Sequence, residues 1–205
     1  MARFILFWLK LLTLGLAVIG GLALFIEFRA PQPVTQQAEK TPFLSLEEFF
    51  EGETVAFGVF EDRFGDVKRQ FRVHINGIVE GNTLTLDETF LYDDGEKAKR
   101  VWTIANQGRT ADGLVQYRGQ AADIAGMAQG IVAGNALNWS YDIDLVTDDG
   151  AFRVHFDDWI YQQDDQVAIN RAYISKYGFE IGSVTLAFLR GAAAQSVLPL
   201  NLERW

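Results

Sequence analysis

Apolar and polar residues alternate along most of the chain after residue 53, as in strands that turn one face to a protein core. The clearest case is residues 152–162, where Phe152, Val154, Phe156 and Ile160 share a face. Stretches with Asp and Gly interrupt the alternation and predict tight turns. The pattern predicts strands near 54–62, 67–79, 83–92, 97–106, 113–120, 126–133, 136–146, 151–162, 167–176 and 182–190.

The predicted strands follow one another without a helical crossover, so each is expected to pair with the next in antiparallel fashion. Many short strands joined by tight turns are typical of a sandwich or a barrel. We expect an all-β, antiparallel up-and-down barrel of about ten strands with lipocalin-like (calycin) architecture, because closure leaves no strand edge exposed. Such a barrel is either filled by side chains or encloses a small cavity, and the sequence leaves both open.

The segment before the strands begins with a long apolar run. Leu11–Ile26 is uncharged, and with Phe4–Leu9 included it is long enough to cross a membrane. The positive charges of Arg3 and Lys10 place the amino terminus in the cytoplasm and the remainder of the chain outside it. A cleaved signal peptide is the alternative, although no small-x-small site ends the run. We therefore expect an N-terminal transmembrane helix over 1–30, acting as a signal anchor.

The remaining boundaries follow from composition. Residues 31–42 are rich in Pro and Gln and predict an extended linker. Ser45 and Glu48 form a capping box that opens a short helix ending near Gly52. The phenylalanines around this helix can dock it on a sheet or close a barrel mouth. The barrel domain is expected over 43–190, followed by a tail at 191–205.

Composition excludes several kinds of site. The chain has no cysteine, which rules out disulfides, thiolate nucleophiles and cysteine zinc sites. Its formal net charge of −9 argues against nucleic-acid binding, which requires a basic surface. No phosphate loop, dinucleotide fingerprint, nucleophile elbow or zinc-helix motif is present. We therefore predict no cofactor, no metal site and no catalytic residues.

Several stretches resemble the domain-of-unknown-function 3833 family. They are DDWIYQQDD at 157–165, INRAYISKYG at 169–178, GSVTLAF at 182–188, FGVFEDRFGDV at 57–67, GNTLTLDETF at 81–90 and GNALNW at 134–139. The family comprises small bacterial envelope proteins, many regarded as lipoproteins, and the resemblance implies no established activity. It implies a bacterial inner-membrane protein whose barrel faces the periplasm. Lacking a cysteine, this chain cannot be lipidated at one.

The strands at 151–162 and 167–176 hold a candidate ion pair. A hairpin tip at Asp164-Asp165 places Asp158 opposite Arg171 and Trp159 opposite Asn170. Asp158 shares the apolar face of its strand, so we expect it to pair with Arg171 inside the barrel. The pair is either structural or a ligand contact. Replacing Arg171 by Leu would then leave a buried, unpaired charge and cost about 3–5 kcal/mol of stability.

Aromatic residues complete the candidate ligand-binding set. Trp139 and Tyr141 share a face with other apolar residues of their strand and point to the interior. His155 and Asp157 form a strand His-x-Asp pair, a potential metal or general-base site that is more simply a solvated surface pair. The ligand-binding residues we predict are Asp158, Arg171, Trp159, Asn170, Trp139 and Tyr141.

Three functions fit this sequence. The first is binding or carriage of an apolar small molecule, such as a lipid or fatty acid, inside the barrel. The second is a structural or assembly role in the cell envelope, which a packed interior and an exposed apolar patch would favour. The third is an enzyme acting on a lipid-like substrate through Asp158, Arg171 and His155, which an open cavity with a raised carboxyl pKa would favour.

Overall fold

The computed structural model describes residues 32–147 and 150–205. Residues Val34–Trp205 form one compact unit, which contains every element described below. The segment predicted to span the membrane lies outside the described residues. None of the helices in the described ranges has the length and apolar composition of a membrane span.

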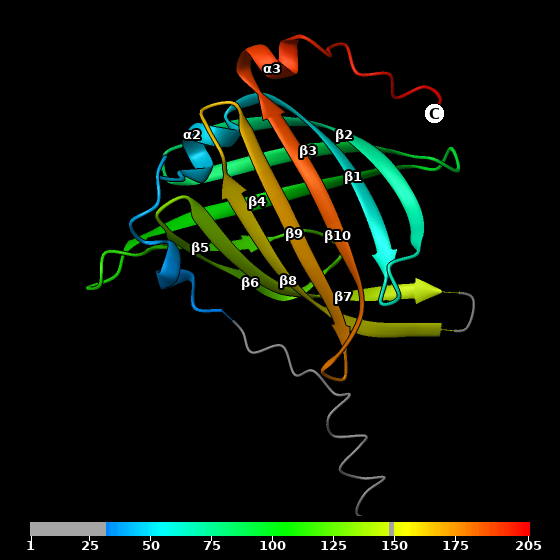
Figure 1. Cartoon of the computed structure of the whole chain (residues 1–205), viewed down its shortest axis with the longest axis horizontal. Helices are drawn as coiled ribbons and strands as arrows, with labels where there is room; N and C mark the ends of the chain where they lie inside the picture. Colours follow the sequence, from blue (N-terminus) through cyan, green and yellow to red (C-terminus); the bar gives the residue numbers. More distant parts are fainter. Residues whose placement is uncertain (1–31, 148–149) are drawn as a thin grey trace, which may run out of the picture. The chain divides into compact units, whose positions relative to one another are not determined.

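Ten strands close into a single barrel in which every strand pairs with its neighbours in sequence (Figure 1). The first and last strands, β1 and β10, pair antiparallel and complete the ring. This confirms the predicted antiparallel up-and-down barrel. The strands are β1 Gly52–Asp62, β2 Val67–Glu80, β3 Thr83–Tyr92, β4 Lys97–Arg109, β5 Val115–Gln120, β6 Ile124–Ala133, β7 Ala136–Thr147, β8 Gly150–Gln162, β9 Val167–Lys176 and β10 Phe179–Arg190.

The barrel interior follows from the alternation of side chains along each strand. On β2, Phe71, Val73 and Ile75 are buried, whereas the residues between them are more exposed. On β7 the inward set includes Trp139 and Tyr141, as the sequence pattern predicts. Aromatic and branched residues from all sides of the ring therefore meet in one continuous core cluster.

A short helix, α2 (Leu46–Phe50), closes one end of the barrel. Ser45 caps it, with its Oγ accepting a hydrogen bond from the Glu48 backbone N–H at 3.2 Å. Leu46, Phe49 and Phe50 of the helix are all buried in the core cluster. The predicted helix is confirmed, and of the two placements open to it the structure shows the plug in the barrel mouth.

Polar contacts and a close backbone approach hold α2 in place. The Glu47 carboxylate accepts hydrogen bonds of 2.8 Å from the Tyr117 hydroxyl and from the Asn106 amide. Burial alone would raise the pKa of Glu47, but these hydrogen bonds outweigh burial and lower the pKa. Gly77 of β2 lies so near the helix that a Cβ there would approach the Phe50 carbonyl oxygen to 1.7 Å. Only glycine leaves room for the helix at this point.

The segments flanking the barrel contain short helices. Within the predicted extended linker, Val34–Gln37 form a 3₁₀ helix, η1, and Val34 packs against Ala133 and Trp159 on the outer face of the barrel. The burial of Val34 explains why this segment is folded rather than extended. After β10, Gly191–Gln195 form the short helix α3.

Candidate ligand cavity

The barrel encloses a cavity of about 380 Å³. Leu46 and Phe50 of α2 form its floor, and every strand except β5 and β6 contributes wall residues. At the other end the wall includes Leu145 near the end of β7, which is 38% exposed. The cavity is therefore sealed by the helix at one end and reaches solvent at the other.

Most of the wall is apolar, and it includes a group of packed aromatic rings around Trp102. Trp102 packs edge-on against Trp139 and Tyr141, with ring centroids 5.6 and 5.4 Å apart. Tyr141 stacks on Phe156 at 5.1 Å. Gly130 and Gly119 make room for this group, because a Cβ at Gly130 would come within 2.3 Å of the Trp139 ring. The two glycines on β5 and β6 therefore fix where the indole lies.

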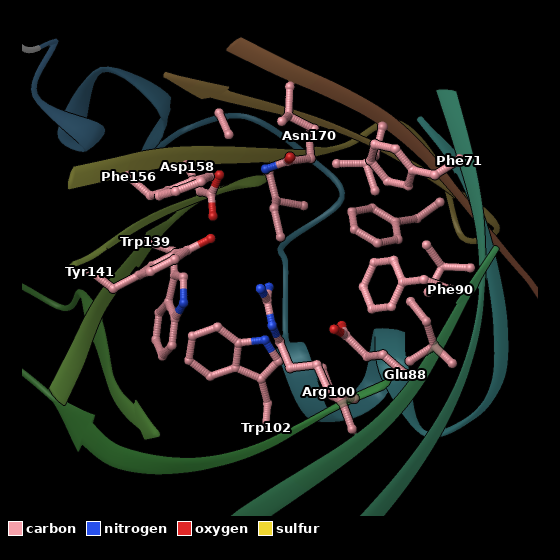
Figure 2. A pocket seen from close by; sticks show the side chains of 18 of the residues that line it. Phe71, Glu88, Phe90, Arg100, Trp102, Trp139, Tyr141, Phe156, Asp158 and Asn170 are labelled. Atoms are coloured by element: carbon pink, nitrogen blue, oxygen red, sulfur yellow. The ribbon is translucent and has the colours of Figure 1, made fainter. Parts of the chain in front are cut away.

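Asp158 projects into the cavity from β8 (Figure 2). The Tyr141 hydroxyl and the Asn170 side chain hydrogen-bond to its carboxyl group. Burial raises the pKa of Asp158 to about 6, and these hydrogen bonds, with the charge of Arg100, limit the rise. Burial also raises the pKa of Tyr141 well above its usual value. Tyr141 is therefore a neutral donor to a carboxylate that titrates near neutral pH.

A second polar pair faces Asp158 from β3 and β4. Glu88 and Arg100 lie directly opposite each other in the strand register, and both side chains point into the cavity (Figure 2). An Arg100 Nη2–Asp123 Oδ2 ion pair of 2.5 Å links the guanidinium to the β5–β6 turn. Burial raises the pKa of Glu88 to about 7, and the nearby charge of Arg100 only partly offsets it. Two carboxyl groups with raised pKa values thus share one cavity.

Arg69 is the second cation in the wall. Its Nη2 lies 2.7 Å from Asp94 Oδ2 and 2.8 Å from Glu96 Oε2. Its guanidinium also packs over the Tyr92 ring at 3.7 Å. Arg69 is therefore held by groups of the β3–β4 turn, at the end of the cavity away from α2.

The structure corrects the predicted pairing of Asp158 with Arg171. The register of β8 and β9 differs by one residue: Asp158 lies opposite Ala172, and Trp159 lies opposite Arg171. The Asp164 carboxylate accepts hydrogen bonds from the backbone N–H groups of Gln166 and Val167, both 2.8 Å, which centres the loop on Asp165. A shift of one residue moves every side chain to the other face of its strand.

The shift changes the location of three predicted residues. Asn170 is inside the barrel and buried, whereas the predicted register, with Asn170 opposite Trp159, would put it on the face away from Asp158. Arg171 is outside, where its Nη1 lies 3.2 Å from Glu61 Oε2 and donates to Thr185 Oγ1 at 2.6 Å. Trp159 is buried on the outer face beneath η1 and does not line the cavity. Asp158, Asn170, Trp139 and Tyr141 do line it.

The sequence reading missed Glu88 and Arg100, and it left Trp102 out of the predicted ligand-binding residues. The signal was present in the alternation: Glu88 is in phase with Leu86 and Phe90, and Arg100 is in phase with Trp102. A charged residue in phase with the apolar face of a strand is the signature of a buried polar group.

His155 lies on the outer face of the barrel. Its Nδ1 is 2.7 Å from Asp142 Oδ1, and its Nε2 is 3.4 Å from Ser140 Oγ. The nearby Asp157 instead accepts hydrogen bonds from Asn138 and Trp159. The predicted His155–Asp157 pair is therefore replaced by contacts across the β7–β8 ladder.

This chain is similar to several solved structures. The S-type phycobiliprotein lyase CPES from Guillardia theta has a TM-score of 0.51 at 10% identity, covering 78% of this chain and 98% of that one. EF1p2_mFAP2b bound to DFHBI has a TM-score of 0.37 at 9% identity, covering 72% and 100%. The ywiB protein from Bacillus subtilis has a TM-score of 0.32 at 16% identity, covering 68% and 91%. The first likeness supports the fold alone.

Sequence comparisons point to one family. A search of curated proteins found no match. The model of a family described as "Protein of unknown function (DUF3833)" matches residues 23–190, which include every strand of the barrel.

Two neighbouring substitutions test the corrected register. Arg171→Leu removes a partly exposed ion pair and should cost about 1 kcal/mol or less. Asn170→Leu removes a donor to the buried Asp158 carboxylate and should cost about 2–3 kcal/mol. Thermal unfolding of the barrel, followed by circular dichroism, measures both. Equal losses of stability in the two variants, or a larger loss for Arg171→Leu, would contradict the observed register of β8 and β9.

Glu88→Gln should relieve the cost of burying a carboxylate. The raised pKa of Glu88 means that its contribution to stability is fully present below about pH 4.5 and is lost as pH rises through about 7. The variant should therefore gain up to about 3 kcal/mol on the wild type between about pH 5 and pH 8. Unfolding curves across this range measure the gain. The exposed Glu53→Gln is the matched control, and an equal gain in both variants would refute the effect.

Proposed function

This chain belongs to the DUF3833 family of proteins of unknown function, and we propose that its barrel binds or carries one small, mostly apolar molecule. The cavity of about 380 Å³ carries this proposal. Small-molecule sites are typically apolar cavities of about 300–1,000 Å³ in which a few polar groups set the orientation. A barrel that only supported other proteins would have no need of a hollow interior.

The shape of the cavity favours an elongated ligand. Its wall runs from Leu46 and Phe50 at the helix to Arg69 and Tyr92 at the other end. The ionisable groups Glu88, Arg100 and Asp158 also lie in this wall, among aromatic and aliphatic side chains. A single-chain lipid, with an apolar body and one polar group, matches this division.

The amino-terminal sequence supports a location for this function. We propose that residues 1–30 anchor the protein in a bacterial inner membrane, with the barrel in the periplasm. An anchored barrel would stay near a supply of lipid-like ligands. Cleavage of the barrel by protease added to spheroplasts tests this placement, and protection until the membrane is lysed would contradict it.

Ligand carriage is tested by filling the cavity. Ala172 is buried in the wall next to Asp158 in the register, and Ala172→Phe would place a ring in the cavity. The full chain in lipid nanodiscs should bind N-phenyl-1-naphthylamine with a Kd on the order of 1 µM. Ala172→Phe should weaken this binding by at least about tenfold, because the dye and the new ring compete for one volume. Fluorescence titration measures the affinity.

Val101→Phe is the matched control. Val101 is 49% exposed on the outer face of β4, so this variant adds the same ring outside the barrel. It also corrects for dye taken up by the nanodisc lipid. Equal binding by the two variants and the wild type would refute the cavity as the site. Native mass spectrometry of the protein purified from its own host should show a bound small molecule that the Ala172→Phe variant lacks.

A further inference from the structure

The cations of the cavity wall are already matched by carboxylates. Arg69 contacts both Asp94 and Glu96. Arg100 is paired with Asp123, and Glu88 faces it across the β3–β4 ladder. An anionic ligand would therefore find no guanidinium without a carboxylate partner among these groups, and it would approach several negative charges.

Glu88 is the acid in the cavity wall whose hydrogen bonding is incomplete. Glu88 is half-buried, and its carboxyl group points into the cavity (Figure 2). Among the described residues no side chain or backbone group hydrogen-bonds to this carboxyl, although Arg100 lies on the adjacent strand. Buried carboxylates in proteins are normally paired or hydrogen-bonded. The Glu88 carboxyl group is therefore positioned to accept hydrogen bonds from a bound molecule.

The surroundings of the two acids suit a positive charge. Across the cavity from Glu88, Asp158 presents a second carboxyl group (Figure 2). The Arg100 guanidinium acts on both acids, but it already has the Asp123 carboxylate as its ion-pair partner. The rings of Trp102, Trp139 and Tyr141 pack together in the wall beside them. Cations are attracted to the faces of aromatic rings, and most strongly to tryptophan. Carboxylates next to aromatic side chains are typical of sites that bind an ammonium group.

We propose that the ligand is a cationic amphiphile, with one alkylammonium-type head group bound between Glu88 and Asp158 and an apolar body filling the remaining cavity. This inference rests on the proposed function, since it specifies the ligand of the same site. Binding requires no covalent step. The carboxylates of Glu88, Asp158 and Asp123 outnumber the Arg100 guanidinium near them. The head group supplies a further positive charge and donates hydrogen bonds to the Glu88 carboxylate.

Affinity for such a ligand depends on pH. The charged and titratable groups that face Glu88 are Arg100 on β4, Asp123 in the β5–β6 turn and Asp158 on β8, with Asp87 beside it on β3. Those that face Asp158 are Tyr141 on β7 and Arg100, with Asp157 on its own strand. Both acids become ionised as pH rises through about 6 and 7. An alkylammonium stays charged over this range, so its binding tightens as pH rises.

A matched series of single-chain compounds tests the head group. Octylammonium, octanol and octanoate share one chain and differ in charge. We would titrate each into the full chain in phosphatidylcholine nanodiscs by isothermal calorimetry, at about pH 5 and about pH 8. At the higher pH, octylammonium should bind at least about tenfold tighter than octanol, and octanoate should bind most weakly. The preference for octylammonium should shrink by about tenfold at the lower pH.

Substitutions at Glu88 and Asp158 test whether these two acids cause the preference for octylammonium. Glu88→Gln and Asp158→Asn keep the side-chain shape and should each reduce the preference for octylammonium over octanol by about tenfold. Glu53→Gln, on the outer surface, should keep it. Circular dichroism confirms that each variant is folded. Because the nanodisc takes up the same ligand in every sample, differences between variants report on the cavity.

The outcomes separate the two proposals. Equal or tighter binding of octanol or octanoate, abolished by Ala172→Phe, would overturn the cationic head group and leave the binding function intact. If Ala172→Phe changed the binding of none of the three compounds, both proposals would fail. A preference for octylammonium that survives both Glu88→Gln and Asp158→Asn would also overturn the assignment.

Discussion

The pairing of β1 with β10 is the interaction on which the rest of the structure depends. It turns a row of hairpins into a ring, and only a ring gives each strand an inner and an outer face. The inner faces then hold apolar side chains from every direction, and the two ends remain the only places to seal or to enter. Helix α2 seals one end, because Gly77 lets its backbone approach and Glu47 ties it to Tyr117 and Asn106.

Local sequence was enough to predict the strands and the short helix before them, but not whether that helix closes the barrel. Each strand bears its own alternation and each turn its own Asp or Gly, so neither depends on distant parts of the chain. The pairing of Asp158 with Arg171 was wrong because register depends on loop geometry that a count along the chain does not contain. At the β8–β9 loop, the Asp164 carboxylate binds two backbone N–H groups and shifts the centre of the loop. That shift exchanges Arg171 for Asn170 inside the barrel.

The interaction between the polar groups of the cavity could not be predicted from the sequence either. Glu88 and Asp158 are far apart in the chain, and only barrel closure brings β3 and β8 to opposite walls. The phase of each strand predicts that both residues face inward. Their effect on each other, through which Asp158 raises the pKa of Glu88, requires the closed ring. The electrostatic character of the site is therefore a property of the fold rather than of any motif.

A hollow barrel with buried acids is less stable than a packed apolar one would be. A void forfeits dispersion contacts, and a buried carboxylate without a complete partner costs solvation energy. The lost dispersion contacts and the lost carboxylate solvation both arise inside the barrel, between α2 and the far end. The outer-face ion pairs, such as Arg153–Asp144, are ordinary surface contacts. A ligand that fills the void and neutralises the acids removes both costs at once. The stability that the empty barrel loses through the void and the acids then contributes to the free energy of ligand binding.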